Sequence, residues 1–334
     1  MRGSKLASSF ELGGPRSVAI MQDSQYSQYF HVDVFTSQPY SGNSLAVFAD
    51  ASGLTGDQMA RITRELRHFE SIFLVPDGDG ADSDVDANAN ANADSDVHRR
   101  QARVFDLFEE LDFAGHPVLG AACVLHELHG GGAPETWTIG LPARTVRITT
   151  ERRASGHYSA VLDQGRAEFF SEPAIPAIPA DAAAWFGLAE KDLDPGLPPQ
   201  VVSTGLRYLI LPVRSGVLEQ ARIVVPDLEQ QLSAIGAQFA YLLDAAAMEG
   251  RHWNNDGVVE DVATGSAAGC VAAYLRRHDR LGDGETATLH QGRFLGRPST
   301  ITIRAHGGGT GVSSVEVGAD VVLVGRGTLD RIPE

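Results

Sequence analysis

Residues 110–128 read ELDFAGHPVLGAACVLHEL, and this stretch decides the fold. From Gly115 to Leu125 it has no formal charge, and small residues are dense. A helix that is apolar on every side is a buried helix, so the pattern predicts a helix inside a core. The glycines of HGGG, residues 129–132, suit the end of that helix.

Residues 260–277, EDVATGSAAGCVAAYLRR, repeat this plan in the second half of the chain. A glycine turn again leads into a charge-free helix, here predicted over Ser266–Leu275. The tripeptide at 114–116, Ala-Gly-His, matches Thr-Gly-Ser at 264–266, and the order of the neighbouring elements agrees. We interpret the pattern as an internal duplication in which strands wrap each buried helix.

Strand-like segments surround both helices. Phe30–Thr36 alternates apolar and polar residues, as a half-buried strand does, and a turn rich in Pro, Gly, Asn and Ser separates it from a second predicted strand, Leu45–Ala49. This pair predicts a hairpin. The other predicted strands are 71–76, 103–108, 135–141, 145–151, 157–164, 201–215, 299–306 and 320–327.

Glu70 lies where a predicted helix meets a predicted strand. Thr55 and Gln58 have the form of a capping box, and Met59, Ile62, Leu66 and Phe69 follow at helical spacing, which indicates one buried face. The helical pattern breaks at Glu70, and SIFLVP then reads as a strand. A side chain at such a junction is expected at the mouth of a site.

The pattern predicts an α/β (α+β) fold of two pseudo-symmetric domains, each a curved, mostly antiparallel sheet or barrel around a central buried helix. We expect a flexible tail over 1–27, an N-terminal domain over 28–172, a linker over 173–200 and a C-terminal domain over 201–330. Residues 77–98 are acidic and of low complexity, which predicts a disordered loop. A calcium loop is the alternative there, but the Gly and the closing Glu of an EF-hand are missing.

Composition excludes several classes of protein. The chain has 334 residues, 43% of them hydrophobic and 21% charged, as in a soluble globular protein. A net charge of −16 argues against nucleic acid as a partner. No apolar run approaches the roughly 20 residues of a membrane span, and no secretion signal is evident. Two cysteines are too few for a disulfide framework, so we expect a cytoplasmic protein.

The two glycine turns predict the chemistry. Each opens a helix, and a helix N-terminus offers unpaired N–H groups and partial positive charge to an anion. If the halves face each other, both ends converge on one cleft that binds a substrate carboxylate without Arg or Lys. The alternative is that the glycines only permit tight turns. A carboxylate beside an apolar cleft, such as Glu70, has a raised pKa that suits acid/base work.

The motifs also resemble those of a known family, the phenazine-biosynthesis PhzF-like proteins, which have the diaminopimelate-epimerase fold. The resemblance covers Phe30 to about Leu329 and rests on six stretches in the family's order: DVFTSQPYSGNSLAVF, RHFESIFLVP, ELDFAGHPVLGAA, STGLRYLILPV, EDVATGSAAG and HQGRFLGRPSTITI. It implies a homodimer without a cofactor or metal, and an active site between two similar domains.

The resemblance also implies residue roles. The family's catalytic glutamate falls on Glu70, its motif histidine on His116, and its motif aspartate and serine on Asp261 and Ser266. Asn43 is expected to contact substrate, together with the backbone amides at Gly115 and Gly265, which would hold the carboxylate. The implied reaction is a cofactor-independent isomerisation in specialised-metabolite (antibiotic) biosynthesis, in which Glu70 moves a proton and double bonds shift in a small cyclic or diene amino acid.

Three departures and three alternatives accompany this hypothesis. The proline that usually follows the motif aspartate is Val262, the segment HWNNDGVV at 252–259 differs from the family's wording, and the acidic loop is unusual. Cys123 and Cys270 lie inside the helices rather than at the turns, so a two-thiol racemase is not expected. The alternatives are a hydrolase, a non-catalytic carboxylate-binding protein, and a metal site at HELH, residues 126–129, which we interpret instead as a solvated last helical turn.

Overall fold

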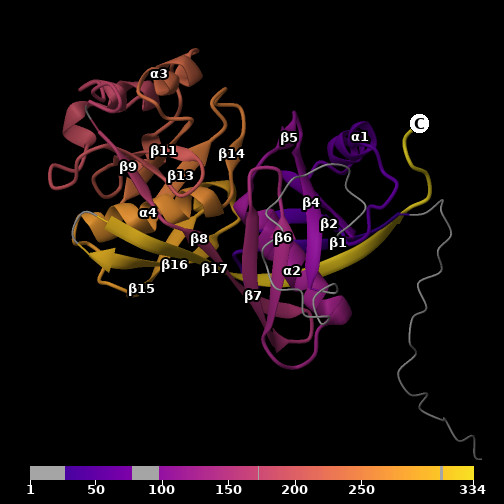
Figure 1. The fold of residues 1–334 in the computed structure, drawn as a ribbon. Coiled ribbons are helices and arrows are strands. Elements are labelled where there is room, and N and C mark those ends of the chain that lie inside the picture. The colour runs from indigo at the N-terminus through magenta and orange to yellow at the C-terminus, as the bar shows by residue number, and fades with distance from the viewer. Residues whose placement is uncertain (1–26, 77–97, 172, 309–310) are drawn as a thin grey trace, which may run out of the picture.

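The computed structural model describes residues 27–76, 98–171, 173–308 and 311–334 (Figure 1). The predicted tail and acidic loop lie outside the described residues, apart from residues 27 and 98. The helices are α1 (Gly56–Leu66), α2 (Gly115–His129), α3 (Leu228–Ala234) and α4 (Gly265–Arg277). The strands are β1 (Ser27–Val34), β2 (Asn43–Phe48), β3 (Glu70–Pro76), β4 (Arg99–Asp106), β5 (Glu110–Leu111), β6 (Glu135–Gly140), β7 (Thr145–Ala154), β8 (His157–Gly165), β9 (Glu168–Phe170), β10 (Gln200–Ser203), β11 (Arg207–Pro212), β12 (Phe239–Asp244), β13 (Glu249–Trp253), β14 (Glu260–Asp261), β15 (Thr286–Gln291), β16 (Ser299–Gly308) and β17 (Gly311–Leu329).

The fold is a strand-rich α/β fold with a closed barrel and few helices. Going round the barrel, the strands pair in the order β1, β2, β3, β4, β6, β7, β8 and β17, and β17 pairs with β1 again. The predicted hairpin is confirmed, because β1 and β2 are antiparallel neighbours. Closure removes the sheet edges that would otherwise offer unpaired backbone groups.

A second run of paired strands follows the order β9, β10, β11, β12, β13, β15, β16 and β17. The amide of Ala167, just before β9, donates to the Val312 carbonyl in β17 at 3.2 Å and draws the two ends together. Figure 1 shows two groups of elements with the long strand β17 passing beneath both. The domain boundaries predicted from the sequence stay a prediction.

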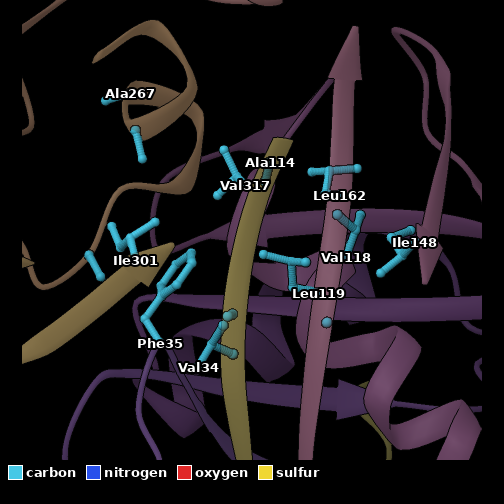
Figure 2. Packing of buried hydrophobic residues seen from close by; sticks show 14 of the residues in the cluster. Val34, Phe35, Ala114, Val118, Leu119, Ile148, Leu162, Ala267, Ile301 and Val317 are labelled. Atoms are coloured by element: carbon cyan, nitrogen blue, oxygen red, sulfur yellow. The ribbon is translucent and has the colours of Figure 1, made fainter. Parts of the chain in front are cut away.

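Helices α2 and α4 are buried, as their apolar sequences predict. α2 contacts strands β1, β2, β3, β6, β7, β8 and β17, all of which belong to the barrel, while α4 contacts β10, β11, β16 and β17. Figure 2 shows Val118 and Leu119 of α2 beside Leu162 of β8 and Val317 of β17. Burying side chains of this size stabilises the fold by about 1.5–3 kcal/mol each.

The alternation of β3 decides which way Glu70 faces. Ile72 and Leu74 belong to the core around α2, whereas Phe73 belongs to a separate cluster beneath α1. Successive side chains of a strand point to opposite faces, so Glu70 shares the α2 side with Ile72 and Leu74. The capping box predicted at Thr55 and Gln58 is present and starts α1.

One detail differs from the sequence-based expectations. The single strand predicted over 201–215 is a hairpin of β10 and β11, because Gly205 turns the chain with a φ of 149°. Trp185 and Phe186, which lie between residues 173 and 200, are buried in a second core cluster. Helix α2 ends at the glycines as predicted: Gly130 is its C-cap residue, and the Gly130 amide donates to the His126 carbonyl.

No helix among the described residues combines the length and apolar character that a membrane crossing requires.

Candidate active site

Glu70 is the first residue of β3 and follows a short connection from the end of α1. Arg67 ends the helix in the left-handed conformation, with a φ of 57°, and His68 and Phe69 lead into the strand. The Glu70 side chain is only 11% exposed, so it lies deeper than the cleft mouth expected from the sequence. Burial raises the pKa of its carboxyl well above the ordinary value, and the charges of Asp261 and Asp106 raise it further.

His116 faces Glu70 from the first turn of α2. Its Nδ1 lies 3.5 Å from Glu70 Oε2, and the His116 ring is 4% exposed. Burial lowers the pKa of His116 to about 4, against an opposing effect of Asp261. Glu70 Oε2 and His116 Nε2 are both buried without a hydrogen-bond partner among the described residues. Two buried polar atoms without hydrogen-bond partners on neighbouring side chains indicate a place prepared for a ligand.

Asp261 lies opposite and is held by a network of donors. Its Oδ2 accepts from the Thr264 hydroxyl at 2.6 Å, and its Oδ1 accepts from Asn43 Nδ2 at 2.8 Å and from the Ala263 amide at 3.3 Å. Asn43 reaches Asp261 from β2, so this bond ties the two halves of the sequence together. Asn43 Oδ1 is buried and unpaired, and the predicted contact of Asn43 with substrate stays a prediction.

The N-termini of α2 and α4 meet at the same place. A Cβ on Gly115 would lie 3.0 Å from the Ser266 nitrogen and 3.2 Å from the Gly265 carbonyl carbon. Neither N-cap residue, Ala114 nor Thr264, supplies a side-chain hydrogen bond to its helix. The glycines are therefore needed for close approach of two backbones, and the positive ends of both helix dipoles point at one spot.

Several supporting residues are absent from the sequence-based prediction. Tyr208 of β11 lies 2.8 Å, hydroxyl to hydroxyl, from Ser266 Oγ. Gln291 of β15 donates to the Asp261 carbonyl and to Thr264 Oγ1, both at 2.9 Å. Gln164 of β8 donates to the Gly265 carbonyl at 2.9 Å. These polar residues lie in strands far along the chain from the glycine turns, and only the sheet pairing brings them there.

Two open cavities among the described residues lie outside this site, one of them adjoining it. One of about 620 Å³ is lined by the proline-rich segment around Pro176, and another of about 510 Å³ by residues between Thr36 and Thr300. Neither is lined by Glu70 or His116. Gln291 borders the second cavity and is also the residue that holds Asp261, so the site and this cavity share a wall. The buried cluster of Glu70, His116 and Asp261 is therefore the candidate site, rather than either open cavity.

The two cysteines and His126 of the HELH segment are buried and have structural roles. Cys123 and Cys270 are buried and form no disulfide, and burial raises the pKa of both thiols, which agrees with the core position predicted for them.

The solvated turn predicted at HELH is wrong for His126. This residue is fully buried, and both of its ring nitrogens are hydrogen-bonded, Nδ1 to the Thr150 hydroxyl and Nε2 to the Gly131 carbonyl. Among the described residues no group of His, Cys, Asp and Glu is arranged to hold a metal ion.

Asp261→Asn is expected to destabilise the fold by about 1–3 kcal/mol. The carboxylate accepts three hydrogen bonds, and an amide in its place brings its own donor against either Asn43 Nδ2 or the Thr264 hydroxyl, so one buried donor loses its partner. Urea unfolding measures the change. The matched control is Asp279→Asn, since Asp279 is 94% exposed. Equal stability of the two variants would contradict the network described here.

The stability of the protein is expected to fall between pH 6.5 and 4 because of His116. The unfolded chain takes up a proton near the ordinary pKa of 6.5, whereas the folded protein does so only near 4. The stabilisation is thus fully present above pH 6.5 and is lost as the pH falls, by roughly 3 kcal/mol at pH 4. Glu70, with its raised pKa, acts in the opposite direction over part of this range.

The comparison of wild type with His116→Asn isolates the histidine. Unfolding free energies measured from pH 7 to pH 4 should converge for the two proteins as the pH falls. His290→Asn, at an exposed histidine, serves as the control and should leave the pH dependence of wild type intact. Parallel curves for wild type and His116→Asn would show that His116 keeps an ordinary pKa in the folded protein.

A family model and a similar protein of known name both match most of this chain. The family model described as phenazine biosynthesis-like protein, PhzC-PhzF, matches residues 32–327. The trans-2,3-dihydro-3-hydroxyanthranilate isomerase of Pseudomonas aeruginosa is 32% identical over 320 residues, covering 90% of this chain and 98% of that protein.

Solved structures agree with the same fold. A predicted epimerase from Pseudomonas aeruginosa is 46% identical, has a TM-score of 0.79, and the match covers 91% of this chain and 99% of that one. A hydroxyproline epimerase from Agrobacterium vitis shares the fold at 14% identity, with a TM-score of 0.56 over 92% of this chain and 94% of that one.

Proposed function

The chain belongs to the phenazine biosynthesis-like (PhzC-PhzF) family and is an isomerase, and on that premise we propose that it moves a proton within a small conjugated carboxylate, with Glu70 as the acid/base group and no cofactor. The observation that carries this proposal is the buried pair of Glu70 Oε2 and His116 Nε2, which have no hydrogen-bond partners among the described residues. The substrate class we propose is a cyclic or diene amino acid of specialised metabolism. The relative named above acts on one such compound, a dihydro-hydroxyanthranilate.

The opposed helix N-termini support the binding step. A Cβ built on Gly115 would lie 3.0 Å from the Ser266 nitrogen, and one built on Gly265 would lie 3.5 Å from the His116 nitrogen, so the first turns of α2 and α4 pack backbone against backbone. A substrate carboxylate there would accept hydrogen bonds from both helices and gain from both dipoles. Such amides also stabilise negative charge that spreads onto the carboxylate when the neighbouring carbon loses its proton.

The raised pKa of Glu70 supports the proton transfer. In the proposed step the Glu70 carboxylate takes a proton from carbon, and the C–H electron pair enters the conjugated system. The double bonds shift, and Glu70 returns the same proton to another carbon. Atoms and charge balance without an oxidant or reductant. A carboxyl whose pKa is raised toward the working pH serves well both as base and as acid.

His116 and Asp261 serve as positioning groups in this proposal. His116 is neutral above its pKa of about 4, so near neutral pH it offers hydrogen bonds to Glu70 or substrate rather than a charge. Asp261 raises the pKa of Glu70 by its charge and orders the α4 turn through Thr264. Ser266 Oγ is bonded to the Tyr208 hydroxyl rather than to a histidine, which does not favour the hydrolase alternative.

We further propose that the two halves are related by pseudo-twofold symmetry around α2 and α4, because the two helices pack on different strands apart from β17, which both contact. A homodimer in solution is also part of the proposal. Sedimentation equilibrium tests it directly, with a mass near 35.6 kDa pointing to a monomer and twice that mass to the dimer.

The test of the reaction is NMR of wild-type protein in D2O with trans-2,3-dihydro-3-hydroxyanthranilate and a panel of cyclic and diene amino acids. The expected result is migration of a double bond, seen as a change in the vinyl proton signals. Deuterium uptake alone is a poor measure, because a shielded carboxyl can return the proton it took. Tight binding without any migration across the panel would favour the carboxylate-binding protein instead.

A further inference from the structure

His252 lies next to Asp261 on the α4 side of the site. It belongs to β13, where its Cα is the register partner of Asp261 in β14. Its ring is buried, with 5% exposed, and its Nδ1 lies 2.9 Å from the Ala240 carbonyl oxygen. A carbonyl can only accept, so Nδ1 carries the hydrogen and Nε2 is left as an acceptor in the neutral ring.

The surroundings of His252 keep it neutral. Tyr208 and Phe239 both meet its ring edge to face, with centroids 5.6 and 5.7 Å away. Burial lowers the pKa of His252, although the charges of Asp261 and Glu260 and the bond to Ala240 act against this. Within the described ranges no hydrogen bond occupies Nε2, so the ring has a free acceptor among aromatic neighbours.

Tyr208 connects His252 with the carboxylate-binding end of α4. The Tyr208 hydroxyl bonds Ser266 Oγ, the side chain of the second residue of α4, while the Tyr208 ring packs on His252. His252 therefore lies one aromatic ring away from the place where the two helix N-termini meet. If a ligand is held there by its carboxylate and extends over Tyr208, its other polar groups come near His252.

We propose that His252 is a specificity-determining residue, whose Nε2 accepts a hydrogen bond from an N–H or O–H group of the substrate. This inference rests on the proposed function for the carboxylate end of the substrate and adds the group at its other end. A ligand that covers this acceptor pairs it only if the ligand brings a donor, and an analogue without the donor leaves the acceptor unpaired. The substrate class is thereby narrowed to carboxylates that bear an amine or hydroxyl.

The test compares benzoate, 2-aminobenzoate and 3-hydroxy-2-aminobenzoate, three planar carboxylates that differ only in their donors. Calorimetry gives their dissociation constants for wild type, His252→Asn and His129→Asn. Asparagine keeps an N–H near the position of Nδ1 for the Ala240 carbonyl and removes Nε2. His129 is an exposed histidine at the end of α2, so His129→Asn controls for the same chemical change.

For wild type and His129→Asn, at least one donor-bearing compound is expected to bind about tenfold more tightly than benzoate. In His252→Asn this advantage should disappear while the affinity for benzoate stays within about twofold. The proposal is overturned if His252→Asn keeps the advantage, or if it loses benzoate as well, since the residue would then be structural. Failure of all three compounds to bind wild type would overturn it together with the proposed carboxylate site.

A second measurement keeps the proposal testable if His252→Asn does not fold. In protein labelled with ¹⁵N-histidine, the Nε2 signal of His252 is expected to move when 2-aminobenzoate is added and to stay in place with benzoate. These experiments test the role of His252 in binding separately from the proposed reaction. If donor recognition depends on His252 while no double bond migrates in any substrate, the reaction we propose is wrong and the role of His252 stands.

Discussion

Glu70→Gln is expected to lower kcat by about 10²–10⁴-fold. Glutamine has the shape of glutamate but cannot take a proton from carbon, so the step in which the double bonds move is lost. Binding should survive, because in the proposed complex the carboxylate is held by backbone amides at Gly115 and Ser266 rather than by Glu70. The measurement is double-bond migration by NMR, with calorimetry for affinity and circular dichroism for the fold.

The matched control is Glu65→Gln, the same chemical change on the exposed face of α1. It should leave both turnover and affinity unchanged. A Glu70→Gln protein that keeps wild-type turnover would remove Glu70 from the mechanism, and His116 would then be the next group to test as the base. Loss of affinity together with turnover would instead mean that Glu70 contacts the bound substrate before the proton moves.

Gly115→Ala is expected to reduce turnover by about 10²-fold and stability by about 1–3 kcal/mol. The added methyl would lie 3.0 Å from the Ser266 nitrogen, and both of its nearest neighbours belong to the backbone of α4. Backbone cannot rotate aside as a flexible side chain can, so the two helix N-termini must separate. The amides of α2 and α4 would then no longer converge on one carboxylate.

The predicted loss of stability in Gly115→Ala is informative because alanine normally stabilises a helix relative to glycine, by about 1 kcal/mol. Gly132→Ala provides the control, since a Cβ at Gly132 meets nothing within 4 Å. Urea unfolding and the dissociation constant of a carboxylate ligand together test the idea. A Gly115→Ala protein as stable and as active as wild type would show that the close approach of the helices is dispensable.

Local features of the fold were predictable where the chain carries its own signal. The capping box at Thr55 and Gln58 uses side chains three residues apart, and the absence of charge in α2 and α4 reports burial directly. Glu70 was predictable as a junction residue because helical spacing stops there. Its inward direction follows from the alternation of β3, once the start of the strand is known.

Features that depend on distant pairing could not be predicted in this way. Tyr208 and Gln291 reach the site only because β11 and β15 lie against the strands around α4, and neither residue stands in a glycine turn. His126 reads as a polar residue near a helix end, but its neighbours Thr150 and Gly131 bury it and bond both nitrogens. Such partners are set by sheet register and are not visible in the local sequence.

The strand pairing of β17 determines when the protein can finish folding during its synthesis. Leu329 pairs with Ser27, and the same strand supplies partners to β8 and β16. While the chain emerges from the ribosome, its first half can form helices and hairpins, but the barrel stays open until β17 is free of the exit tunnel. Its unpaired strand edges are exposed for that whole interval, which is when such edges pair wrongly. A chain cut short before β17 would thus lose both halves of the molecule at once, however intact its earlier residues.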